Sequence, residues 1–362
     1  MLFSHISDTH LGLVQYGSEE REQDVYHVFN QAIDISIKDH VDFVIFAGDI
    51  FHVPNPNFIL GDHDISRIRT TPIPYVYHNL EFSRYIGQGN PIYYKGILLV
   101  GFDKIRKAEI SQFEEKFKAI DEIAKNHTGH KILVMHQGIT EFNKFAGELQ
   151  STDLPKNFTY YAMGHLHDHD IKQFNHLNGP IAYPGSIELT TSEGIKEIKK
   201  GFLEVDISGE EVKPNWIELD TRKQFSFKTE YNELTKSIDE ISIKIDKMER
   251  KPIVEIKIQG ENIETDQIQA QISRLHAQTL RCFWRITFKE TSDSSVFLER
   301  PNSIEDEMFR LSVDAIGSEQ IANFAVKELL PLLASNQIKE ASQIIIENFE
   351  KYKKEKENDH VN

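Results

Sequence analysis

Short apolar runs alternate with amphipathic helical stretches over about the first 220 residues, and this alternation constrains the fold more strongly than any other feature. The run VDFVIFA at 41–47 is typical of a strand covered on both faces of a parallel sheet. Stretches 21–40 and 104–126 repeat apolar residues at helical spacing. The pattern predicts an α/β domain, in which ligands bind beyond the carboxyl ends of the strands.

The pattern changes after Asp220. Residues 234–248 carry apolar side chains in steps of three and four, which predicts a helix, and 252–260 alternates as a strand does. Stretches 264–277 and 282–290 repeat this order, so we expect a small α+β domain followed by helices. The expected domains are 1–221, 222–297 and 298–362, and the last contains helices at 304–316, 318–334 and 337–355.

Composition excludes several classes of protein. The chain has 362 residues and a formal net charge of −16, which argues against coating nucleic acid by bulk electrostatic attraction but not against holding it through bound cations. The single cysteine, Cys282, fits a reducing compartment. No apolar run approaches the roughly 20 residues that span a bilayer. We therefore expect a soluble, cytoplasmic protein.

Five short polar segments follow, or could follow, predicted strands. Aspartate and histidine together suit manganese, iron or zinc, whereas carboxylates alone suit magnesium or calcium. In extended backbone, residues i and i+2 point the same way, so Asp8 and His10 can bind an ion from one side, as can His165 and His167. The segments are Asp8-Thr9-His10, Gly48-Asp49-Ile50-Phe51-His52, Gly61-Asp62-His63-Asp64, His136-Gln137-Gly138 and Gly164-His165-Leu166-His167.

Each motif has a simpler interpretation when it is taken alone. Asp-Thr-His and Gly-Asp commonly form turns, and His-x-His on a strand is commonly a surface pair. The metal interpretation depends on all five segments occurring in order at strand ends. In that case the two oxygens of Asp49 could bridge two cations, an arrangement that promotes phosphoryl transfer. His5, inside the first strand, is interpreted as a core histidine.

The ordered motifs DTH, GDIFH, GDHD, MHQG, GHLH and YPGS resemble those of the calcineurin-like metallophosphoesterases. The stretch EREQDVYHVFNQAI and the histidine of GDIFH are similar to one branch, the double-strand-break repair nucleases that include bacterial SbcD and archaeal and eukaryotic Mre11. The acidic, compact chain is more similar to the archaeal members. The motifs cover residues 1 to about 190, and the remainder matches this branch only in layout.

The resemblance implies a fold, an activity and partners. The fold would be a β-sandwich flanked by helices (1–221), with a small α+β capping domain (222–297) and C-terminal ATPase-binding helices (298–362). The activity would be manganese-dependent, exonucleolytic on duplex DNA and endonucleolytic on single strands. The implied partners are DNA, a Rad50 or SbcC ATPase and a second copy of the chain.

The resemblance also implies roles for individual residues. One manganese ion would be held by Asp8, His10, Asp49 and His167, and a second by Asp49, Asp62, His136 and His165. His63 would steady the phosphate and help to protonate the leaving group, and His52 would lie near the scissile phosphate.

Two features depart from this family. The third motif has Asp62 where the family usually has asparagine. The added negative charge of Asp62 should bind cations more strongly but repel substrate phosphate. Only eight residues, VPNPNFIL, separate the second motif from the third, whereas the connection between two parallel strands needs about a dozen or more. Three explanations are open. The short loop could stay at the top of the sheet and still bring His63 to the site, or the protein could carry a deletion that damages its packing. Alternatively, the sequence could lack residues that are present in the real chain.

Other functions and contacts therefore stay open. The chain could be a metallophosphatase for small phosphoesters, or a DNA-end-binding scaffold whose nuclease is impaired by the short loop. Apolar residues lie on more than one side of the C-terminal helices, which favours an ATPase partner, but these helices could instead pack onto the first domain.

Overall fold

The computed structural model describes residues 1–52, 80, 82–106, 109–144, 146–190, 193–260, 263–287, 312, 319–330, 342–346 and 348. Contacts divide the chain into two compact units, Met1–Lys289 and Glu290–Asn362. The predicted boundary at 221/222 falls inside the first unit and stays a prediction. The loop at 53–60, Asp62 and His63 lie outside the described residues.

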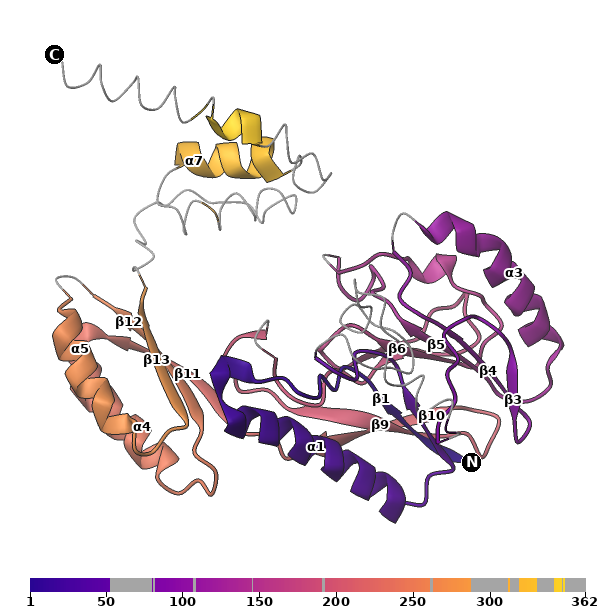
Figure 1. Cartoon of the computed structure of the whole chain (residues 1–362), viewed down its shortest axis with the longest axis horizontal. Coiled ribbons are helices and arrows are strands. Elements are labelled where there is room, and N and C mark those ends of the chain that lie inside the picture. Colours follow the sequence, from indigo (N-terminus) through magenta and orange to yellow (C-terminus); the bar gives the residue numbers. More distant parts are fainter. Residues whose placement is uncertain are drawn as a thin grey trace. The chain divides into compact units, whose positions relative to one another are not determined.

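Two mixed sheets form most of the first unit (Figure 1). In the first sheet, β1 pairs in parallel with β2 and antiparallel with β9, which continues to β10. In the second, four strands run parallel, and short antiparallel strands form both edges. The orders are β10(Lys213–Leu219)-β9(Lys200–Asp206)-β1(Leu2–Ile6)-β2(Phe43–Phe46) and β3(Ile92–Tyr94)-β4(Ile97–Phe102)-β5(Lys131–His136)-β6(Tyr160–Gly164)-β8(Ile181–Tyr183)-β7(Asp170–Lys172).

The two sheets pack face to face. Their shared core joins Phe3 and Leu203 of the first sheet to Val134 and Ala162 of the second. Helix α1 (Glu19–Lys38) covers the outer face of the first sheet and α3 (Ile110–Asn126) covers that of the second, as Figure 1 shows. The predicted β-sandwich flanked by helices is therefore confirmed.

A third sheet is parallel and has the order β11(Gln224–Glu230)-β12(Ile253–Gln259)-β13(Arg281–Ile286). Helices α4 (Leu234–Ile245) and α5 (Thr265–Ile272) pack on it through a separate apolar core. The helix-strand order expected from the sequence is thus present. Short 3₁₀ helices occur at Gln15–Gly17, Ser151–Asp153, Tyr231–Glu233 and Ser273–Leu275.

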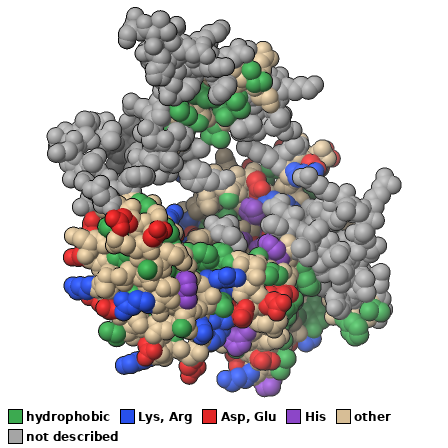
Figure 2. All heavy atoms as spheres, turned by 60° about the vertical axis from the view of Figure 1, so that its left-hand side comes forward, with side chains coloured by type: hydrophobic (Ala, Val, Ile, Leu, Met, Phe, Trp, Pro, Cys, Tyr) green, Lys and Arg blue, Asp and Glu red, His purple; other side chains and the backbone are tan. Residues whose placement is uncertain are grey.

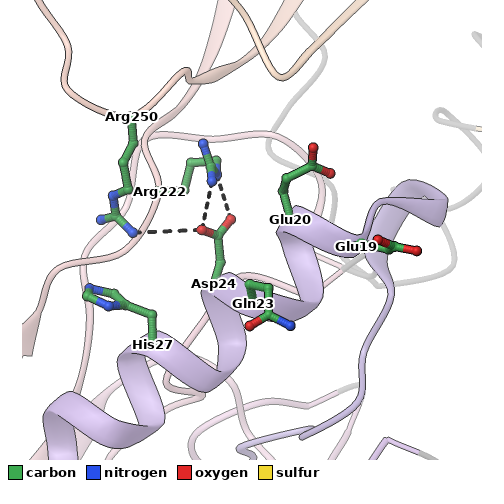
Figure 3. Close-up of a pocket in the computed structure, with 7 residues that line it drawn as sticks. All are labelled: Glu19, Glu20, Gln23, Asp24, His27, Arg222 and Arg250. Atoms are coloured by element: carbon green, nitrogen blue, oxygen red, sulfur yellow. Dashed lines mark hydrogen bonds and ion pairs between the residues drawn. The ribbon is translucent and has the colours of Figure 1, made fainter.

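A buried aspartate joins helix α1 to the segments that flank the third sheet (Figure 3). Asp24 accepts hydrogen bonds from Arg222 Nε at 2.5 Å and Nη2 at 2.8 Å, and Arg250 Nη1 lies 3.8 Å away. The fully buried Arg21, on the same helix as Asp24, donates to the Asp24 carboxylate at 2.7 Å and also pairs with Glu188 at 3.2 Å. The aspartate is therefore shared by three guanidinium groups.

Several elements differ from the sequence-based expectation. The helix predicted at 104–126 begins at Ile110, because the Gln137 side chain bonds both the N–H and the C=O of Ile105 and holds that segment in a loop. Strand β2 is less covered than expected, since Phe43, Val44 and Phe46 are only partly buried. Strands β3, β7, β10 and β11 were not predicted.

In the second unit, the described residues form α7 (Glu319–Asn323), which continues as a π-helix over Phe324–Leu329. This agrees with part of the helix predicted at 318–334. Most of the helices predicted at 304–316 and 337–355 lies outside the described residues. Within the described part of the chain, no helix combines the length and the apolar character that crossing a membrane requires.

Candidate metal centre

The first two motifs are brought together by the parallel pairing of β1 with β2. Asp8 follows β1 and Asp49 follows β2, and both loops run side by side beyond the strand ends. The N–H of Asp8 donates to the C=O of Gly48 at 3.1 Å, and the N–H of His10 donates to the C=O of Asp49 at 3.0 Å. The sheet thus delivers both carboxylates to one edge, as the alternating pattern predicted.

The second sheet supplies histidines at the same edge. His136 is the last residue of β5, and His165 follows β6. A Cβ on Gly48 would lie 2.3 Å from His136 Nδ1, and one on Gly164 would lie 2.0 Å from the carbonyl oxygen of Ala47. Glycine at both positions therefore lets the two sheets approach closely enough for the histidines to meet the carboxylates.

One donor group consists of Asp8, Asp49 and His136, whose ligand atoms all lie within 4.8 Å of one another. His136 Nδ1 lies 2.8 Å from the carbonyl oxygen of Ala47, while Nε2 is buried without a hydrogen-bond partner. Nε2 lies 3.5 Å from Asp49 Oδ2 and 4.0 Å from Asp8 Oδ1. Ligands at about 2.0–2.2 Å from a shared cation have separations close to these, so the group fits a divalent ion.

A second donor group consists of Asp8, His10 and His167. The Nε2 atoms of the two histidines lie 3.2 Å apart, and His167 Nε2 lies 3.8 Å from Asp8 Oδ1. Two imidazole nitrogens and a carboxylate turned toward one point again fit a cation. Asp8 belongs to both groups and Asp49 to one, so the bridge that the resemblance implies for Asp49 stays a prediction.

Two further predicted residues lie beside these groups without belonging to them. The backbone N–H of His165 donates to both oxygens of Asp8, at 3.2 and 3.1 Å, and its Nε2 lies 3.3 Å from Lys104 Nζ. The His52 ring lies 5.7 Å from the His10 ring, centroid to centroid. The structure therefore brings seven of the nine predicted residues together: Asp8, His10, Asp49, His52, His136, His165 and His167.

Burial and mutual charge perturb the ionisation of the cluster. Burial raises the pKa of Asp8. Burial alone would lower the pKa of His136, but the Asp49 and Asp8 carboxylates outweigh it and raise that pKa to about 10. The same competition, with Glu193 and Asp8 as the anions, raises the pKa of His167. The cluster therefore favours positive charge at its centre, as a cation site does.

Sequence reasoning missed the residues that surround the outer histidines. His167 Nδ1 faces Thr190 and Glu193, and Glu193 pairs with Lys200. Lys104, beside His165, forms an ion pair with Glu148 at 2.7 Å. The rule that polar residues after strand ends carry function could have found Lys104, which follows β4 by two residues. The others lie in loops or within a strand and carry no such signal.

A cavity of about 390 Å³ opens onto the cluster. Its lining includes Asp49, His165, His167 and Glu193, together with Phe142 from the neighbouring loop. A cavity of about 470 Å³ lies instead at the junction around Asp24, where Arg222 and Arg250 are already bound to carboxylates (Figure 3). The chemistry of the first cavity, not the size of the second, identifies the candidate site.

Comparison with known proteins gives an independent result. The model of the calcineurin-like phosphoesterase superfamily domain matches residues 1–206. The chain is 30% identical to a DNA double-strand break repair protein Mre11 of Sulfurisphaera tokodaii, over 90% of this chain and 89% of that protein. It is 31% identical to the proteins of the same name from Thermoplasma acidophilum (75% and 80% of the two chains) and Methanocaldococcus jannaschii (72% and 77%).

Proposed function

Because the chain belongs to the calcineurin-like phosphoesterase superfamily and, within it, to the Mre11 family of metal-dependent phosphodiesterases, we propose that it is a manganese-dependent nuclease of DNA double-strand-break repair. One observation carries the proposal. Two groups of carboxylate and imidazole donors meet at the shared residue Asp8, at the sheet edge where the strand ends of both sheets converge. A pair of adjacent cation sites is an arrangement that promotes hydrolysis of a phosphodiester.

The proposal assigns ligands to two manganese ions. Asp8, His10, Asp49 and His167 would hold one, and Asp49, Asp62, His136 and His165 the other. A bound pair of divalent ions supplies an activated water and neutralises the charge that develops on phosphorus. Among the described residues, the buried carboxylates would hold the ions, while His136 is oriented by its hydrogen bond to the backbone at Ala47. His63 would act as the proton donor and His52 would contact the phosphate.

The distribution of charge means that a polyanionic substrate would have to be attracted by bound cations, since the net charge is −16. Figure 2 shows that lysine, arginine, aspartate and glutamate side chains are interspersed on the face in view, with histidines among them. The cavity above the cluster carries several carboxylates, including Asp49, Asp168, Asp170 and Glu193. Phosphate would therefore be attracted chiefly by bound cations, which makes binding at this site metal-dependent.

The partners are part of the same proposal. The described residues of the second unit expose Ile321, Leu330, Ile345 and Ile346. Exposed apolar side chains of this kind support docking of a Rad50-type ATPase on residues 298–362. Residues 222–297 would cap the nuclease domain, and the nuclease domain would form a homodimer.

A nuclease assay with a matched pair of variants tests the proposal. Purified full-length protein with manganese is given linear duplex DNA, single-stranded circles and p-nitrophenyl phosphate esters. His136→Ala removes a buried donor, whereas His276→Ala removes an exposed histidine near the third sheet. We expect cleavage of both DNAs by the wild type and by His276→Ala, and none by His136→Ala or His63→Ala.

The alternatives predict different outcomes of the same assay. Turnover of the small esters alone would identify a metallophosphatase and contradict the nuclease assignment. Tight binding of duplex ends without cleavage by the wild type would identify a scaffold. Cleavage that survives in His136→Ala would show that the cluster is not the active site.

A further inference from the structure

His167 presents its two ring nitrogens to different surroundings. Nε2 faces the proposed cation site, 3.8 Å from Asp8 Oδ1 and 3.2 Å from His10 Nε2. Nδ1 faces the opposite way, 3.4 Å from Glu193 Oε2 and 3.2 Å from Thr190 Oγ1. One nitrogen is therefore available for an ion only if the other carries the proton.

Glu193 is held in place as a buried anion. Its side chain is 7% exposed, and Oε1 pairs with the ammonium group of Lys200, whose side chain is 2% exposed. The backbone N–H of Thr190 donates to Oε2 at 2.8 Å, and the Thr190 hydroxyl donates to the same oxygen at 3.1 Å. Lys200 Nζ also donates to the carbonyl oxygen of His167 at 2.8 Å. These contacts fix both the carboxylate and the backbone of the histidine that it faces.

The chemistry of this arrangement is specific. A carboxylate that accepts Nδ1–H selects the tautomer with a lone pair on Nε2, fixes the ring plane and makes Nε2 a better donor to a metal. An uncharged acceptor would select the same tautomer more weakly, because hydrogen bonds to an ionised group are stronger. Lys200 compensates the buried charge of Glu193.

We propose that Glu193 and Lys200 form a positioning pair that holds His167 with Nε2 directed at the cation site, and so sets the affinity of that site. The pair acts through His167 and is not itself a ligand. This inference rests on the proposed function, because it assigns a divalent cation to the group of Asp8, His10 and His167.

Manganese titration of the full-length chain tests the pair. Glu193→Gln keeps the size of the side chain and removes its charge. The matched control is Glu197→Gln, the same change on a side chain that is 65% exposed. Its carboxylate makes a long, exposed ion pair with Lys244, at 3.9 Å. We expect Glu193→Gln to weaken one of two manganese sites by about 10–100-fold, as loss of such partners does, and Glu197→Gln to leave both unchanged.

A second variant separates positioning from misfolding. Glu193→Gln leaves the buried Lys200 without its counter-ion, so the double variant Glu193→Gln/Lys200→Met removes both charges. We expect the double variant to melt near the wild-type temperature in the metal-free state and to keep the weakened site. We also expect the visible spectrum of Co²⁺ in the site to change in Glu193→Gln and not in Glu197→Gln, because the His167 ligand is displaced.

The outcomes distinguish this proposal from the function on which it rests. A wild-type chain that binds no manganese would overturn both. Two sites of wild-type affinity in Glu193→Gln would overturn the positioning pair and leave the metal centre intact. Restoration of wild-type affinity in the double variant would likewise contradict it, because the loss would then come from the unpaired lysine.

Discussion

Four residues of the cluster have a left-handed backbone, with φ of 51° at Asp8, 44° at His10, 47° at Asp49 and 95° at His165. Such conformations are uncommon outside glycine and cost about 1–3 kcal/mol each where they are strained. They turn each side chain sharply as it leaves a strand end, so that donors from separate loops face the same point. Strained backbone concentrated in one place agrees with the assignment of function to this edge.

The close approach at Gly48 gives a test at the scale of one residue. Gly48 has φ of +90°, and an added Cβ would lie 2.3 Å from His136 Nδ1. Gly12 has a similar φ of +85°, but nothing lies within 4 Å of its Cβ position. We expect Gly12→Ala to lower the free energy of unfolding by about 1–2 kcal/mol, the cost of the backbone alone. Gly48→Ala should lower the free energy of unfolding by more than this, measured by urea unfolding. It should also weaken manganese binding, measured by calorimetry. Equal losses in the two variants would contradict the role of Gly48.

His5 gives a test by pH. It is buried in β1 with Nδ1 3.0 Å from the Tyr160 hydroxyl, and burial lowers its pKa to about 3. Below its ordinary pKa of 6.5, the unfolded chain binds a proton that the folded chain refuses, so stability falls as pH falls toward 3. In metal-free protein, His5→Gln should reduce this slope by up to about 1.4 kcal/mol per pH unit. Parallel stability curves for the two proteins would exclude a neutral, buried His5.

At the scale of elements, Asp24 links helix α1 to the third sheet, because it pairs with Arg222, just before β11, and with Arg250, just before β12. Removing one partner of a buried ion pair typically costs about 3–5 kcal/mol, because the remaining charge stays buried. We expect a loss of that size for Asp24→Asn, since Arg21 is fully buried and Arg222 nearly so.

The exposed Asp34, on the same helix, supplies the control for this link. Asp34→Asn should change stability by less than about 0.5 kcal/mol, as surface substitutions usually do. Tryptophan fluorescence during urea unfolding measures both variants, because Trp216 lies in the first sheet and Trp284 in the third. Similar losses from the two substitutions would show that Asp24 does not join the elements.

The elements that the sequence predicts well are those with a strong local period. The strand at 252–260 and the helix that starts at 234 occur as expected. Strands β3 and β7 have three residues each, too few for a period to be recognised. The start of α3 depends on Gln137, which is distant in the sequence, so no local pattern could locate it.

The same reasoning explains which site residues were predicted. Aspartates and histidines at strand ends are unusual enough to be noticed together, and the parallel pairing of strands brings them to one edge. Glu193 and Lys200 are ordinary charged residues in a loop and at the start of β9, and their meeting with His167 depends on a chain reversal that the sequence does not encode locally. Their part in the site is visible only in three dimensions.

At the scale of the whole molecule, metal binding and folding should be linked. Manganese at about 100 times its dissociation constant should raise the free energy of unfolding by about 2.7 kcal/mol for each site. The gain should shrink as pH falls, because the raised pKa of His136, about 10, means that a proton must leave before an ion binds. Unfolding with manganese and with EDTA, at pH 8 and pH 5, measures this. The same gain at both values would contradict displacement of a proton.

The central claim is that loops from two packed sheets assemble a pair of cation sites around Asp8 and Asp49. Crystals of the full-length chain grown with manganese, and an anomalous difference map recorded at the manganese edge, test it most directly. The account predicts two peaks, one bounded by Asp8, His10, Asp49 and His167 and the other beside Asp49, His136 and His165. A map with no peak among these side chains in manganese-saturated crystals would contradict it.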